Sequence, residues 1–310
     1  MIRQKVQMLK KRNKKIFLIL TISISVSCNN STQNKINAPV DFILPNAPAI
    51  IIDQRESYKY IALNYWNDFN FADSTAYRQT TEQIFANFLN VLQYTDLQII
   101  LQSVETMMQK AATDSLAYIR FVDICEKYLY GANSPYRSDD LYIPVLQSII
   151  STNIISENYK TVARYRLNMA MKNRTGTQAA DFEYTLESGK TCNMHDIKTE
   201  FILLFIYNPD CNACKEYSER IQNSQLIRQL INKNLLTVLA VYPDKDLDEW
   251  KKYLAQTPSD WINARDTKLA IKNDEIYDIR AIPTLYLLGK NKKVLLKDTF
   301  VENVEKYFSL

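Results

Sequence analysis

Glycine and histidine are both scarce in this chain of 310 residues. The 4 glycines are widely spaced, so no glycine-rich loop is available to cradle a nucleotide phosphate, which argues against a Rossmann or P-loop site. The single histidine, His195, leaves almost no basis for a Ser-His-Asp or Cys-His catalytic site. The 5 cysteines are too sparse for a disulfide-stapled scaffold, so the fold must depend on a buried core, which a composition of 46% hydrophobic residues can supply.

Basic charge is lacking once the first 27 residues are set aside. Residues 1–27 contain seven Lys and Arg residues and no acidic residue, so the formal net charge of +4 becomes −3 for the rest of the chain. A mildly acidic mature chain offers no electrostatic footprint for nucleic acid, and we expect no nucleic-acid partner.

Residues 1–27 have the pattern of an export signal. A basic stretch precedes the apolar run 16–26, which is too short to span a bilayer but suits the hydrophobic region of a signal peptide. Cys28 follows directly, and this arrangement resembles a bacterial lipoprotein signal, in which the cysteine becomes the lipidated first residue of the mature chain. An ordinary cleaved signal and a short membrane anchor are the alternatives.

Residues 28–40 are expected to form a polar tether behind the lipid. The tether lacks the acidic run that resembles a surface-export signal in Bacteroidetes lipoproteins. We therefore expect a protein of the bacterial cell envelope that is attached to a membrane through its lipid anchor and faces the periplasm.

Residues 41–172 are predicted to form an all-α domain. Apolar residues recur at helical spacing within 84–92, 97–111, 118–129 and 141–149. Amphipathic helices in series bury their apolar stripes against one another, so a small bundle is expected. Cys125 lies within its stripe and is expected to be a small buried hydrophobe. The aromatic cluster from Tyr58 to Phe71 is expected to be core as well, with a peptide- or glycan-binding face as the alternative.

Residues 179–310, after a short polar linker at 173–178, alternate between strand and helix patterns. The apolar runs 201–207 and 235–242 are typical of strands that are buried on both faces. Hairpin patterns occur at 182–193 and 284–296. Helices are predicted from Cys211 to about Leu230, at 246–256, at 268–273 and at 301–308. The order β-β-β-α-β-α-α-β-β-α indicates an α/β fold with βαβ crossovers.

Cys211 and Cys214 stand where the first buried strand turns into a helix. The N–H groups and the dipole of a helix N-terminus stabilise a thiolate at Cys211. Two intervening residues bring both sulfurs to one turn, so Cys211 is the predicted nucleophile and Cys214 the cysteine that resolves a mixed disulfide. This motif between an apolar strand and a helix of an exported chain is a strong signal for a redox pair. Asp210 opposes a thiolate at Cys211, because its negative charge lies beside that residue.

A zinc site is the competing interpretation of the cysteine spacing. Cys192 and His195 precede the pair at intervals that imitate zinc ligands. The intervening strand 201–207 spans roughly 23 Å at about 3.3 Å per residue, which places the two pairs at its opposite ends. We therefore expect neither a metal nor another cofactor, with His195 in a surface turn and Cys192 as an inert strand residue.

Five motifs together resemble a TlpA-like member of the thioredoxin superfamily, over nearly all of residues 179–310. They are Asp181–Leu186, Gly189-Lys190, Phe201–Tyr207, the pair Cys211-x-x-Cys214, and Ala281-Ile282-Pro283-Thr284. The resemblance implies a thioredoxin-like α/β fold. It also implies that Pro283 is cis and packs against the cysteines, and that the backbone of Ile282 pairs with the bound substrate chain.

The helical region has a resemblance of its own. Residues 65–71, 134–137 and 141–144 resemble parts of a helical domain of unknown function that precedes thioredoxin-like domains in Bacteroidetes lipoproteins. This resemblance implies an architecture and no activity.

The thioredoxin-like region departs from its relatives at several positions. No Trp precedes Cys211, no Glu-x-Pro follows Cys214, and Asn212-Ala213 is neither the Gly-Pro of strong reductants nor the Pro-His of strong oxidants. These departures leave the redox direction open.

The expected function is that of a membrane-anchored thiol–disulfide oxidoreductase, and a reductase in preference to an oxidase. Its expected partners are exported proteins that contain disulfides and a membrane thiol–disulfide electron donor. The alternative is a non-enzymatic binding lipoprotein in which the Cys211–Cys214 bond is only structural.

Overall fold

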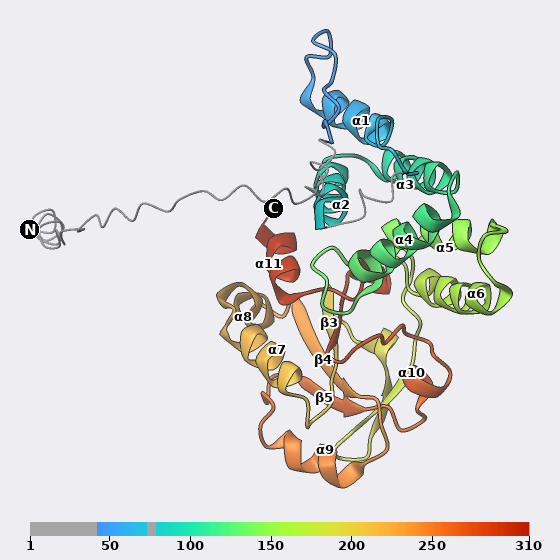
Figure 1. Ribbon diagram of the computed structural model, residues 1–310. Helices are drawn as coiled ribbons and strands as arrows, with labels where there is room; N and C mark the ends of the chain where they lie inside the picture. Colours follow the sequence, from blue (N-terminus) through green and yellow to red (C-terminus); the bar gives the residue numbers. More distant parts are fainter. Residues whose placement is uncertain (1–41, 73–78, 310) are drawn as a thin grey trace, which may run out of the picture. The chain divides into compact units, whose positions relative to one another are not determined.

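The computed structural model describes residues 42–72 and 79–309, which belong to one compact unit (Figure 1). The predicted export signal, Cys28 and the tether at 28–40 lie outside the described residues, so their roles stay predictions. Within the described part of the chain, no helix has the length and apolar character needed to cross a bilayer.

The first half of the chain is helical, as its apolar periodicity predicts. Its helices are α1 (Gln54–Asn64), α2 (Gln79–Leu92), α3 (Leu97–Ala111), α4 (Ser115–Cys125), α5 (Asp139–Ser151) and α6 (Glu157–Met171), and a π-helical turn at Glu126–Tyr130 continues α4. Four of them begin at an Asp or Ser whose side chain accepts a hydrogen bond from an N–H three residues on. These caps are Asp53, Asp96, Asp114 and Ser138.

The apolar stripes of these helices meet in one core. Cys125 is fully buried there, which confirms that it is a core residue. Tyr65, Trp66 and Phe71 are buried in the same core, so the core interpretation of the aromatic cluster is correct for these three. Tyr58 is half-buried and stacks on Tyr94 with ring centroids 4.6 Å apart.

The second half of the chain forms a seven-stranded mixed sheet. The strands are β1 (Glu183–Leu186), β2 (Thr191–Asn193), β3 (Phe201–Ile206), β4 (Leu236–Tyr242), β5 (Ile262–Arg265), β6 (Thr284–Leu288) and β7 (Val294–Leu296). Their order across the sheet is β2-β1-β5-β4-β3-β6-β7, with β3 parallel to β4 and antiparallel to β6. The two strands predicted to be buried on both faces are therefore central.

Each face of the sheet carries its own core. Side chains of β3 alternate between the two, with Leu203 and Phe205 on one face and Ile202 and Leu204 on the other. Residues of α7 (Asn212–Asn223), α8 (Gln225–Asn232), α9 (Leu247–Leu254) and α11 (Val301–Ser309) pack on the first face, and α10 (Ala270–Asn273) packs on the second. This arrangement confirms the thioredoxin-like α/β fold predicted for this region.

Two details differ from the expectation. The single helix predicted from Cys211 to about Leu230 is two helices, because Ser224 has an extended backbone and its hydroxyl caps α8 at the N–H of Ile227. The short strand β5 is absent from the predicted order. Only Ala264 of its four residues is buried, so β5 has no apolar pattern to reveal it.

Candidate active site

Cys211 lies at the N-cap position of α7, directly after the turn that follows β3. The backbone N–H of Cys214 donates a hydrogen bond to Cys211 Sγ over 3.1 Å. This is the helix N-terminal donor that the sequence predicted for the first cysteine, and it favours negative charge on that sulfur. Cys211 is half-buried, and both cysteines are free thiols.

Cys214 is fully buried in the first turn of α7. Its Sγ accepts a hydrogen bond from the N–H of Asn208 at 3.5 Å. Burial raises the pKa of the Cys214 thiol well above its ordinary value, so Cys214 stays protonated at neutral pH. An accessible sulfur in front of a buried, protonated one is the arrangement that a nucleophile and a resolving cysteine require.

The surroundings of Cys214 are aromatic. Tyr207 and Tyr253 pack with ring centroids 5.2 Å apart, in the same apolar cluster as Cys214. Burial raises the pKa of Tyr253, and the nearby Cys214 raises it further. This environment keeps water from the second sulfur.

The loop before β6 lies against Cys211 and forms one side of the site. The Ile282–Pro283 peptide bond is cis, as the resemblance implied. The Cys211 thiol donates to the carbonyl oxygen of Ile282 over 3.5 Å, so the loop and the first cysteine are in contact. The pairing of Ile282 with a substrate chain stays a prediction.

Asp210 is exposed, and its N–H donates to Asn208 Oδ1 at 3.2 Å. Water screens a charge at such a position. Its opposition to a thiolate at Cys211 is therefore weaker than adjacency in the sequence suggests.

The structure places Cys192 and His195 away from the cysteine pair. Cys192 lies in β2, which is the edge strand at the end of the sheet beyond β1, β5 and β4, whereas the pair follows β3. His195 is half-buried in a 3-10 turn, where its Nε2 contacts the carbonyl oxygen of Ala179 at 2.9 Å. Within the described ranges, no three His, Cys, Asp or Glu side chains gather in a way that could hold a metal ion.

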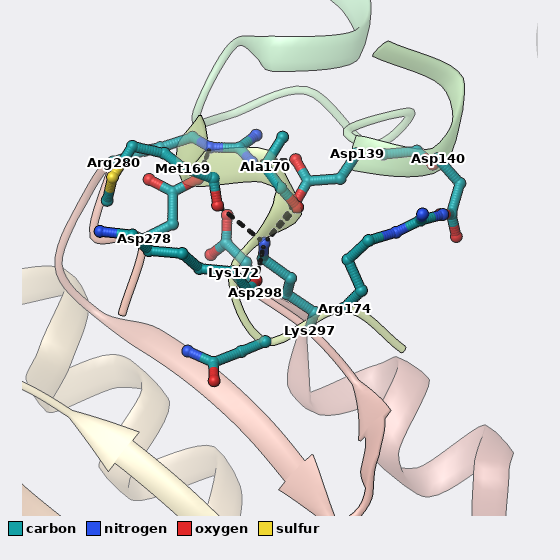
Figure 2. A network of polar contacts seen from close by, with 12 residues as sticks. Asp139, Asp140, Met169, Ala170, Lys172, Arg174, Asp278, Arg280, Lys297 and Asp298 are labelled. Carbon is teal, nitrogen blue, oxygen red and sulfur yellow. Dashed lines mark hydrogen bonds and ion pairs between the residues drawn. The ribbon is translucent and has the colours of Figure 1, made fainter. Parts of the chain in front are cut away.

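A buried ionic cluster, which we call the junction cluster, joins the cis-proline loop to the helical region (Figure 2). The Arg280 side chain is 4% exposed and forms ion pairs with Asp139 of α5 and with Asp278, the latter at 2.9 Å. Lys297 also binds Asp139, at 2.7 Å. Arg137 binds Asp298 at 3.0 Å. Three cations therefore face three carboxylates.

Two helix ends meet in the junction cluster. Asp139 lies in the first turn of α5, where a negative charge is favourable. Lys297 donates to the carbonyl oxygens of Met169, Ala170 and Lys172 at the C-terminal end of α6, where a positive charge is favourable (Figure 2). The cluster therefore links both helices to the loop that precedes Ile282.

Sequence reasoning did not identify the residues of this cluster. Asp278 and Arg280 are a charged pair just before the Ala281–Thr284 motif, and that position is the one available signal. Arg280 and Asp139 are 141 residues apart in the chain, so no local periodicity could have paired them.

Comparisons with known protein families match the helical region and the thioredoxin-like region separately. Residues 10–173 match the family described as Domain of unknown function (DUF5106), and residues 199–294 match the family described as Thioredoxin-like. The crystal structure of a thioredoxin-like protein from Bacteroides caccae is 37% identical and superimposes with a TM-score of 0.82, covering 88% of this chain and 99% of that one. The C-terminal domain of an uncharacterized protein from Bacteroides fragilis is 48% identical with a TM-score of 0.44, over 44% of this chain and 99% of that one. No curated protein matches.

Proposed function

Since the chain belongs to the family of thioredoxin-like proteins that carry an N-terminal domain of unknown function, we propose that it is a thiol–disulfide oxidoreductase. The observation that carries the proposal is the asymmetry of the cysteine pair. Cys211 is accessible and receives a backbone N–H at a helix N-terminus, whereas Cys214 is buried and protonated behind it.

The reaction follows from this asymmetry. Cys211 as the thiolate attacks one sulfur of a substrate disulfide, the S–S bond breaks, and the departing thiolate takes a proton from solvent. Cys214 then attacks Cys211 Sγ in the mixed disulfide, and its proton passes to the second departing thiolate. The substrate has gained two electrons and two protons, and the protein holds a Cys211–Cys214 disulfide. A dithiol donor returns it to the reduced form by the same exchange.

We further propose that the enzyme works as a reductase. A strong oxidant needs a reduced form that is specially stabilised. Here the backbone donor to Cys211 is opposed by the carbonyl oxygen of Ile282, which accepts from the neutral thiol. These contacts favour electron transfer toward the substrate.

The cellular setting is part of the same proposal. Cys28 would be lipidated and hold the chain on a membrane of the cell envelope, facing the periplasm. Disulfide-containing exported proteins would be the substrates, and a membrane thiol–disulfide carrier would supply electrons, in the manner of TlpA-like proteins. The sequence pattern of residues 1–28 supports this placement. Labelled palmitate should enter the wild-type chain and not a Cys28→Ser variant.

The test of the proposed function is a pair of cysteine variants. Cys214→Ser should accumulate mixed disulfides through Cys211, because the resolving thiol is missing. Cys211→Ser is the matched control and should trap nothing. If Cys214→Ser captures no partner, and the pair has a potential below about −300 mV with no exchange against dithiols, the bond is structural and the chain is a binding lipoprotein instead.

A further inference from the structure

A cleft of about 250 Å³ is lined by two residues that contact the cysteine pair. One wall comes from the thioredoxin-like region and includes Asn208 and Ile282. The opposite wall comes from the helical region, with Tyr130 of the π-helical turn and Tyr165 and Met169 of α6. The helical region thus forms part of the surface next to the reactive sulfurs.

The cleft and the cysteines share residues. Asn208 donates its N–H to Cys214 Sγ, and Ile282 accepts from Cys211 Sγ through its carbonyl oxygen. Both residues also line the cleft. A polypeptide whose cysteine reacts at Cys211 therefore has neighbouring residues within reach of this cleft.

The charged groups of the cleft are already paired. Lys272 binds Asp244, and Arg280 binds Asp278. The Tyr165 hydroxyl donates to Glu275 over 2.7 Å. That hydrogen bond raises the pKa of Tyr165 to about 12, so the hydroxyl remains a donor. A charged ligand would have to displace an existing partner.

The remaining surface is aromatic and aliphatic. The guanidinium groups of Arg166 and Arg280 both lie over the Tyr130 ring, at 4.4 and 4.7 Å from its centroid, which restrains its orientation. Met169 is almost fully buried, and Tyr165 is 50% exposed. Burial of an exposed aromatic side chain of this kind against an apolar group of a ligand is favourable in free energy.

The walls are held together before any ligand arrives. Lys172 Nζ donates to the carbonyl oxygen of Glu275 at 2.7 Å, and Asn173 Nδ2 donates to that of Ile276 at 2.8 Å. The pair between Arg280 and Asp139 adds a buried contact across the same junction (Figure 2). A preformed cleft binds with a smaller loss of conformational entropy than one that must be ordered on binding.

We propose that this cleft binds substrate polypeptide next to the reacting cysteine, and that it selects substrates with an aromatic or aliphatic side chain close to that cysteine. The proposal rests on the proposed function and assigns to the helical region a part in choosing the substrate. Tyr165 is the specificity-determining residue, because it is the exposed aromatic group of the helical wall.

The experiment uses synthetic peptides that carry one cysteine in a mixed disulfide with thionitrobenzoate. The residue near the cysteine is Trp, Leu, Ser, Glu or Lys, and thionitrobenzoate release by the reduced full-length protein is followed over a single turnover, because each reduced molecule supplies one electron pair. The peptide concentration at half-maximal rate is taken as KM and the limiting rate constant as kcat. The wild-type protein should act on the Trp and Leu peptides with the lowest KM. Tyr165→Ala should raise that KM about tenfold and leave kcat unchanged, which corresponds to about 1.4 kcal/mol of lost binding.

Two further variants and a small disulfide serve as controls. Tyr165→Phe keeps the ring and should retain the preference. Tyr159→Ala removes a tyrosine of the same helix that is 42% exposed and does not line the cleft, so it should leave KM unchanged. Dithiobis-nitrobenzoate alone has no flanking residue, and all three variants should react with it at the wild-type rate.

The outcomes separate the two proposals. Equal KM values for all peptides, a preference for charged residues, or an equal loss in Tyr165→Ala and Tyr159→Ala would overturn the substrate preference and leave the oxidoreductase intact. A wild-type protein that fails to react even with dithiobis-nitrobenzoate would overturn the proposed function, and the substrate preference with it.

Discussion

The helical region and the thioredoxin-like region differ in how each is held together and in how they meet. Each has an apolar core of its own, built from residues such as Phe121 in the first and Phe205 in the second. Their contact includes instead the junction cluster, whose charged side chains are almost as buried as the cores. An apolar core stabilises a region without fixing its partner, whereas a buried ion pair tolerates little rearrangement.

This difference has a functional side. Asp278 and Arg280 of the junction cluster lie on the loop that carries Ile282, so the position of the helical region and the geometry beside Cys211 depend on the same contacts. The helical region is therefore a structural neighbour of the active site and not only a spacer.

The largest expected effect is that of Asp139→Ala. The change leaves Arg280 and Lys297 without their shared carboxylate in a buried setting, which is expected to lower the free energy of unfolding by about 3–5 kcal/mol. Urea denaturation measures it. Asp140→Ala is the matched control, because the neighbouring Asp140 is 39% exposed and pairs with Arg174, and it should lower that free energy by less than about 1 kcal/mol. Equal losses in the two variants would contradict the buried role of the cluster.

The second prediction compares a buried cysteine of each region. Burial raises the pKa of both Cys125 and Cys214. Brief treatment of the reduced protein with iodoacetamide at neutral pH should therefore alkylate Cys211 and spare both of these. In a separate sample of reduced protein that has not been alkylated, a small disulfide oxidant should distinguish them, since it consumes Cys214 through Cys211 and leaves Cys125 a thiol. Peptide mapping by mass spectrometry measures both the alkylation and the oxidation. Oxidation of Cys125 at the same rate as Cys214 would contradict the prediction.

The smallest effect is expected at the surface of the helical region. A hydrogen bond from Lys127 lowers the pKa of Glu82, so ionised Glu82 stabilises the folded state. That contribution is present above the ordinary carboxyl pKa and is lost as the pH falls through the lowered folded value. Glu82→Gln should thus reduce the free energy of unfolding at neutral pH by less than about 1 kcal/mol. The difference from wild type should vanish in acid, and a deficit that persists there would contradict the electrostatic account.

Much of the fold could be predicted because its signals are local. The strands Phe201–Ile206 and Leu236–Tyr242 are continuous apolar runs, and α3 is a regular amphipathic stripe. The break at Ser224 and the strand β5 could not be predicted in the same way. The helix break at Ser224 depends partly on a hydrogen bond from Ser224 to Glu305, 81 residues away. The strand β5 forms because it pairs with β1 and β4.

The sequence by itself determined the cysteine pair and its strand-to-helix setting, because helix N-termini and buried strands follow from the order of residue types along a short stretch. Only the tertiary structure decided that Cys214 is the buried sulfur, that Arg280 meets Asp139, and that Tyr165 lies across a cleft from Ile282. Cys214 is buried by several strands and helices of the thioredoxin-like region, which come together only on folding. The Arg280–Asp139 pair and the cleft join segments more than a hundred residues apart, and their contacts exist only after both regions have packed together.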